Sequence, residues 1–164
     1  MKRTILLVVT ILFIISANSQ EKKIWAKSFI NKKAPSIIVE KWLTQKPNTE
    51  GKFILLDFWA TWCGPCIKAI PELNSFQKEF KKDLVVIGIS SETPRKVKKQ
   101  RNPKIKYFSA IDRKRRLNTI LEIKGIPHCI LIDPRGIVRW EGYPILKNNE
   151  LTSKVIKELI KKYK

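Results

Sequence analysis

The feature that most constrains this chain is a pair of cysteines placed between an apolar run and a helix-like pattern. Residues 53–59 are apolar except for Asp57, and Cys63 and Cys66 follow them. Apolar residues then recur at helical spacing, and residues 84–89 form a second apolar run of strand length. Such nearly continuous apolar strands are typical of a parallel sheet covered on both faces. The sequence therefore predicts a βαβ unit whose helix begins at the cysteines.

The two cysteines can act as a redox pair because of their position in that helix. They lie three positions apart, on one helix face, so their sulfurs can meet. Cys63 lies at the helix N-terminus, where unpaired backbone N–H groups favour the nucleophilic thiolate. We therefore predict that Cys63 attacks and that Cys66 resolves the mixed disulfide. A purely structural disulfide is the alternative, but closing so short a loop removes little chain entropy.

The remaining sequence predicts one α/β domain. Residues 20–50 are expected to pack on the core, with a short strand at 36–39. Asp112 resembles the cap residue of a later helix. The further elements expected are a helix near 93–101, a strand at 107–111, a helix up to Gly125, strands at 128–133 and 137–143, and an amphipathic helix at 151–163.

Several short motifs resemble those of a known family. They are Trp62-Cys63-Gly64-Pro65-Cys66, the preceding Asp57-Phe58-Trp59-Ala60-Thr61, Pro71, Ala34-Pro35 and Gly125-Ile126-Pro127. With them, residues 34–164 resemble the thioredoxin family, in particular its TlpA- and ResA-like exported thiol-disulfide oxidoreductases. The resemblance implies a thioredoxin fold with an N-terminal extension and a central helix-strand insertion.

The resemblance also implies roles for residues around the cysteines. Asp57 matches a buried acid that accepts a proton from the second cysteine, here Cys66; a strand-edge aspartate that reaches solvent or a lysine is the alternative. Pro127 matches a cis-proline, and the backbone of Ile126 would pair with an extended substrate segment. Trp62 would form part of the substrate-contact surface.

Two further residues near this motif carry open alternatives. His128 is the only histidine, and it either assists a thiolate or is structural or simply exposed. Cys129 falls in an expected buried strand, where a free cysteine commonly acts as a small apolar residue, and a third redox partner is the alternative.

The N-terminus indicates export. Lys2 and Arg3 precede an apolar stretch that ends at an A-x-S cleavage pattern, which predicts a signal peptide at 1–19 and a domain at 20–164. A retained anchor is the alternative, although the apolar stretch is short for a membrane span. We therefore expect a periplasmic or cell-envelope protein.

The charge is strongly basic but spread along the chain. The formal net charge is +20, and loss of Lys2 and Arg3 with the leader leaves +18. Export and the wide spread argue against nucleic acid, so a solvated basic surface that favours acidic partners or anionic lipid is expected.

Together these observations predict an exported enzyme that reduces protein disulfides through Cys63 and Cys66. Gly64-Pro65 between the cysteines matches reducing members of the family, and a reductant outside the cytoplasm needs a membrane-linked electron donor. We expect a monomer that uses no cofactor and no metal. The alternatives are a disulfide oxidase or isomerase, a metal-binding protein, or a non-catalytic binding module.

Overall fold

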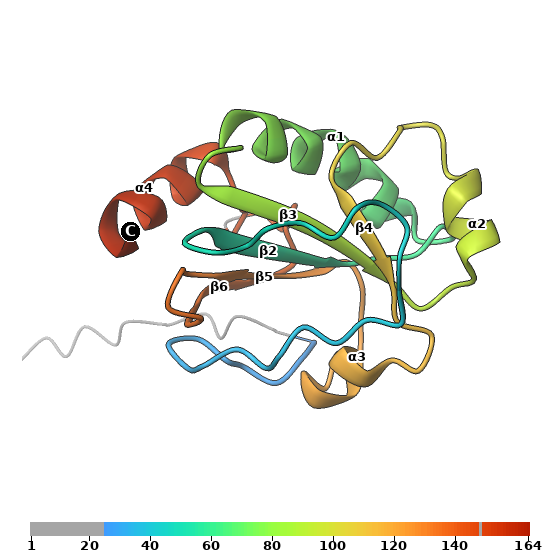
Figure 1. The fold of residues 1–164 in the computed structure, drawn as a ribbon, viewed down its shortest axis with the longest axis horizontal. Helices are drawn as coiled ribbons and strands as arrows, with labels where there is room; N and C mark the ends of the chain where they lie inside the picture. The colour runs from blue at the N-terminus through green and yellow to red at the C-terminus, as the bar shows by residue number, and fades with distance from the viewer. Residues whose placement is uncertain (1–24, 148) are drawn as a thin grey trace, which may run out of the picture.

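A computed structural model describes residues 25–147 and 149–164. Its centre is a six-stranded sheet with the order β1-β4-β3-β2-β5-β6 (Figure 1). The predicted leader at 1–19 lies outside the described residues.

The predicted βαβ unit forms the middle of the sheet. β2 (Phe53–Phe58) and β3 (Leu84–Ser90) are parallel, and α1 (Gly64–Glu79) connects them. Their residues are almost all buried, which explains the lack of a polar face in either strand. Pro71 lies inside α1, and Pro65 lies in its first turn, where a missing N–H costs little.

The remaining strands extend this unit on both sides. β4 (Phe108–Ile111) runs parallel to β3, and β1 (Lys41–Trp42) pairs antiparallel with β4 at the edge. On the other side, β5 (His128–Ile132) pairs antiparallel with β2, and β6 (Val138–Gly142) pairs antiparallel with β5. This order is the predicted thioredoxin arrangement.

Two layers cover the sheet (Figure 1). On one face, α1 and α4 (Ser153–Tyr163) pack over one hydrophobic cluster. On the other, α3 (Arg116–Ile120) and the N-terminal extension cover a second cluster. α2 (Pro94–Lys99) and β4 form the central insertion between β3 and α3. The extension and the helix-strand insertion are thus both confirmed.

Three local expectations were wrong. The helix expected up to Gly125 ends at Ile120. Residues 36–39 form no strand, because Ile37 and Val39 pack across the second cluster and only Lys41 and Trp42 reach the sheet edge. Asp112 is not the cap residue of α3; that position is Arg115, although the Asp112 carboxylate accepts a hydrogen bond from the Leu117 N–H at 3.1 Å. A loop residue three positions earlier therefore does part of the capping.

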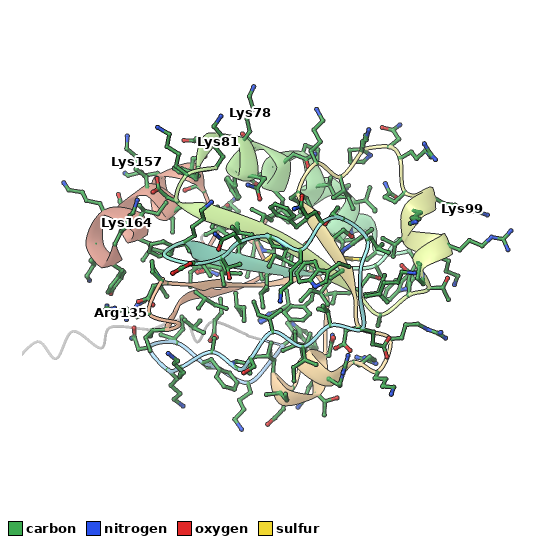
Figure 2. The ribbon with its side chains drawn as sticks, viewed as in Figure 1. Lys78, Lys81, Lys99, Arg135, Lys157 and Lys164 are labelled. Atoms are coloured by element: carbon green, nitrogen blue, oxygen red, sulfur yellow. A yellow bond between two sulfur atoms is a disulfide. The ribbon has the colours of Figure 1, made fainter. Side chains whose placement is uncertain are left out.

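Basic side chains project from all around the molecule rather than from one face. Figure 2 labels six of them, which come from α1 and the turn after it, from α2, from the β5–β6 turn and from α4: Lys78, Lys81, Lys99, Arg135, Lys157 and Lys164. None of the helices in the described part of the chain combines the length and hydropathy needed to cross a membrane.

Candidate active site

The two cysteines lie at the start of α1, just after the short loop that connects β2 to this helix. Cys63 is the N-cap residue of α1, with extended backbone angles, and its sulfur accepts a hydrogen bond from the Cys66 N–H at 3.2 Å. The two residues form a disulfide, with their Cα atoms 5.2 Å apart. The structure therefore represents the oxidised pair, with the Cys63 sulfur where helix N–H groups would stabilise a thiolate after reduction.

A carboxylate from another element holds the loop before Cys63. Glu92, just after β3, accepts two hydrogen bonds from Thr61: the backbone N–H at 2.6 Å and the hydroxyl at 2.9 Å. Glu92 was not predicted from the sequence. The only sequence feature that could have indicated Glu92 is its position: it is an acidic residue just after a buried strand and before a basic stretch.

Asp57 is buried in the middle of the sheet, with only 2% of its surface exposed. Its carboxylate accepts hydrogen bonds from the Tyr107 hydroxyl at 3.2 Å and the Cys129 thiol at 3.5 Å. Burial raises the pKa of Asp57 to about 7, and the two hydrogen bonds oppose that rise. Asp57 can therefore exchange a proton near neutral pH.

The strand register explains this cluster. Asp57 lies between Gly88 of β3 and Cys129 of β5 in one row across the sheet. A Cβ atom at Gly88 would come within 2.9 Å of the Tyr107 ring, so the glycine leaves the space through which Tyr107 reaches Asp57. Burial is the main reason that the pKa values of Tyr107 and Cys129 are both raised, and both groups therefore stay protonated as donors.

Cys129 is fully buried, as expected, but it is not merely an apolar filler, because its thiol contacts Asp57. His128 is also buried, with its ring 6.4 Å from the Phe58 ring. The exposed alternative for His128 was therefore wrong.

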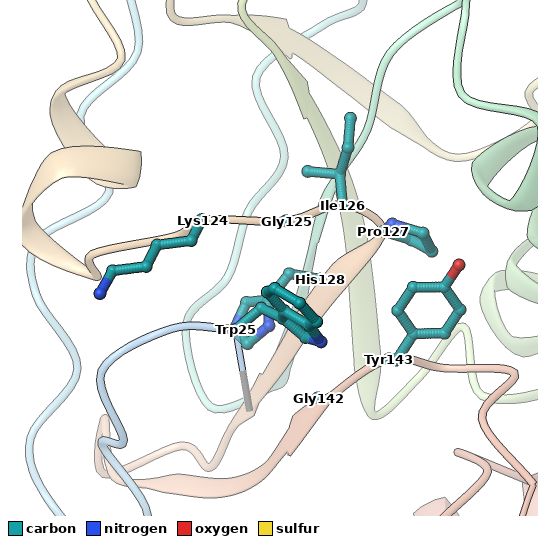
Figure 3. A pocket seen from close by; sticks show the side chains of 8 residues that line it. All are labelled: Trp25, Lys124, Gly125, Ile126, Pro127, His128, Gly142 and Tyr143. Atoms are coloured by element: carbon teal, nitrogen blue, oxygen red, sulfur yellow. The ribbon is translucent and has the colours of Figure 1, made fainter. Parts of the chain in front are cut away.

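The peptide bond between Ile126 and Pro127 is cis, as the resemblance implied. Ile126 packs against the small cluster that contains Cys63 and Cys66. Figure 3 shows this loop from close by, with the Ile126 side chain pointing away from Trp25 and His128, and Tyr143 beside Pro127. These residues line a cavity of about 370 Å³ on one side of the loop.

A second cavity, of about 400 Å³, lies between Ile126 and Trp62. Trp62 is 73% exposed, whereas Trp59 is buried, as expected for the residue on the strand. The structure thus places Cys63, Cys66 and Ile126 in one small cluster, with the exposed Trp62 next to Cys63 in the chain. The hydrogen bonds found for the Asp57 carboxylate are with Tyr107 and Cys129, not with either cysteine of the pair.

The side chains that commonly bind metal ions are dispersed in the described part of the chain. Within residues 25–147 and 149–164, no three His, Cys, Asp or Glu side chains gather closely enough to hold a metal ion.

Comparisons with known proteins agree with this geometry. The model of the AhpC/TSA family matches residues 30–141. The chain is 30% identical over 112 residues to the thioredoxin-like protein YneN of Bacillus subtilis, a match that covers 66% of each chain. It is 32% identical over 118 residues to the thiol-disulfide oxidoreductase ResA of Bacillus thuringiensis, a match that covers 68% of each.

A solved structure supports the same assignment. A thiol:disulfide interchange protein from Bacteroides sp. superposes with a TM-score of 0.63 and 27% identity, over 82% of this chain and 89% of that one. The chain therefore belongs to the AhpC/TSA family, among its thioredoxin-like thiol-disulfide oxidoreductases.

Proposed function

We propose that this protein is exported and reduces disulfides in other proteins through Cys63 and Cys66. The observation that carries the proposal is the cysteine pair at the N-terminus of α1, beside the cis Ile126–Pro127 loop. The leader predicted at 1–19 supports export to the periplasm or cell envelope.

The reaction takes two exchange steps. The Cys63 thiolate attacks one sulfur of a substrate disulfide, so that a Cys63–substrate bond forms and the other substrate sulfur leaves as a thiolate. The Cys66 thiolate then attacks the Cys63 sulfur and releases the second substrate thiolate. Two electrons pass to the substrate, both leaving thiolates take up protons, and the Cys63–Cys66 disulfide remains.

Asp57 serves the second step as a proton acceptor for Cys66. A carboxyl with a pKa near 7 is well matched to this task at neutral pH, because it is neither always charged nor always protonated.

The substrate lies against Trp62, Ile126 and Pro127. The exposed Trp62 ring gives an apolar contact surface, and the Ile126 backbone pairs with an extended substrate segment as an added strand. A membrane-linked donor returns electrons to the pair, and the protein works as a monomer.

The test uses the purified protein and its Cys63→Ser variant. We expect the reduced wild type to accelerate insulin reduction by dithiothreitol and the variant to lose that activity. Equal activity of the two proteins would instead indicate a non-catalytic binding module. Equilibration with glutathione gives the direction: a potential near that of thioredoxin, about −270 mV, supports a reductase, and one near −120 mV indicates an oxidase.

A further inference from the structure

The cavity between Trp62 and Ile126 has an apolar floor, and Trp62, one of its lining residues, directly precedes Cys63 in the chain. Its lining includes side chains from the end of β2, from β3 and from the loop after α3: Phe58, Trp59, Ala60, Ile89 and Ile123. All five are buried members of the core, so the floor is fixed rather than loose. Because Trp62 forms one wall of this cavity, a substrate segment bound at Cys63 can extend over it.

The rim of the same cavity is cationic. Arg115 and Lys124 both line it, and both side chains are exposed. Within the described part of the chain, no carboxylate lies within ion-pair distance of either residue, and none lines the cavity. Figure 3 shows Lys124 on the same loop as Gly125 and Ile126, the residue whose backbone is proposed to pair with the substrate.

The acidic residues near the rim are already engaged elsewhere. Glu122 forms an ion pair with Lys27 at 3.4 Å, and Asp112 forms one with Arg116 at 3.2 Å. Glu92 accepts both hydrogen bonds of Thr61. The positive charge at the cavity is therefore left for an external partner.

We propose that this cavity selects substrate cysteines whose flanking segment carries a large apolar side chain and a carboxylate. The apolar side chain fills the floor beside Trp62, and the carboxylate lies between Arg115 and Lys124. This inference rests on the proposed reduction of protein disulfides and names the substrate class. The overall charge of the chain, +20, adds long-range attraction for acidic proteins but cannot by itself place a carboxylate.

The test compares two disulfide-bonded peptides of equal length. Both carry leucine next to the cysteine; one carries glutamate two positions further on, and the other carries glutamine there. We expect the reduced wild type to prefer the glutamate peptide by about fivefold in kcat/KM, as two exposed ion pairs would give. In Arg115→Gln/Lys124→Gln, the preference should fall to about one.

A matched control separates the cavity from the overall charge. Lys99→Gln/Lys157→Gln removes the same two charges from exposed positions on α2 and α4 (Figure 2), and should keep the preference. If this control loses the preference as fully as the cavity variant does, the overall charge is responsible and the inference is wrong. Equal reduction of both peptides by the wild type also contradicts it, while the proposed function stands.

Failure of the proposed function gives a different result. In that case neither peptide is reduced by the wild type or by any variant, and the selectivity inference falls with the activity. Phosphatidylserine vesicles test a lipid surface as the alternative partner. If Arg115→Gln/Lys124→Gln loses vesicle binding but keeps the peptide preference, the rim binds lipid and the inference is overturned.

Discussion

At the scale of single residues, Asp57 shows how a sheet can hold an acid that is expensive to bury. An ionised carboxylate in an apolar interior is stabilised only by groups that donate to it. Asp57 has two such donors, Tyr107 from the insertion and Cys129 from the neighbouring strand, and its pKa is still raised to about 7. The two donors therefore set how far the pKa rises.

Removing the Cys129 donor should raise the pKa of Asp57 further. We expect Cys129→Ala to move the Asp57 titration above pH 7, because the hydrogen bond from Cys129 favours the charged carboxylate. The titration of the Asp57 carboxyl carbon, followed by NMR in the oxidised protein, measures this shift. Cys129→Ser keeps a donor and is the matched control. If alanine and serine give the same midpoint, Cys129 does not influence Asp57.

Asp57 should also make the protein less stable as the pH rises. Its pKa is about 7 in the folded protein and near 3.8 in an unfolded chain, so between these values only the folded state holds the proton. The contribution of Asp57 to the free energy of unfolding is fully present below pH 4. It falls by about 1.4 kcal/mol per pH unit up to pH 7, roughly 4 kcal/mol in all.

Asp57→Asn removes this dependence, so the free energy of unfolding of the variant relative to wild type should rise from pH 4 to pH 7 and then level off. Urea unfolding at a series of pH values gives the difference. A constant difference across this range would show that Asp57 does not titrate there. The same variant should slow the release of substrate from the mixed disulfide, since Cys66 loses its proton acceptor.

At the scale of elements, the loop before α1 depends on the loop after β3. Glu92→Ala removes the acceptor for both Thr61 hydrogen bonds, and we expect a loss of about 1–3 kcal/mol in the free energy of unfolding. A looser loop should also change the rate at which Cys63 reacts with iodoacetamide in the reduced protein.

Glu92→Gln is the control for that change, because its carbonyl oxygen can still accept from the Thr61 N–H and its amide can donate to the hydroxyl. It should recover most of the stability and the reactivity of the wild type. Wild-type behaviour of the alanine variant in both measurements would mean that the cysteine loop holds its shape without Glu92.

The elements that the sequence predicted well are those with a strong period. β2, α1 and β3 follow from continuous apolar runs and helical spacing, and the positions of Cys63 and Cys66 follow from them. By contrast, the short apolar run at residues 36–39 indicated a strand, yet Ile37 and Val39 pack across a sheet face without any strand partner. Local pattern does not distinguish the two.

The missed site residues depend on long-range pairing instead. Tyr107 is 50 residues from Asp57 in sequence, and Cys129 is 72 residues away. The strand register places Cys129 opposite Asp57, and the pairing of β4 with β3 brings in Tyr107, which directly precedes β4. No local motif encodes these pairings. The sequence therefore indicated the cysteine pair and Asp57 but not the residues that donate hydrogen bonds to Asp57.

At the scale of the whole molecule, the direction of electron flow is linked to folding stability. A pair that is harder to reduce in the folded protein than in an unfolded chain must make the oxidised fold more stable than the reduced fold, by about 1.4 kcal/mol for each 30 mV. In a strong oxidant the reduced fold is instead more stable than the oxidised fold.

For a reductant we therefore expect the oxidised protein to unfold at a higher denaturant concentration than the reduced protein. Urea unfolding of both forms at pH 7, with dithiothreitol present for the reduced form, measures the difference. Cys63→Ser/Cys66→Ser, which cannot form the bond, should unfold at the same concentration with and without dithiothreitol, and so controls for effects of the reagent. If the reduced form is the more stable one, the protein is built to donate its disulfide, and the same two cysteines, with the same Asp57 and Ile126–Pro127 around them, act as an oxidase.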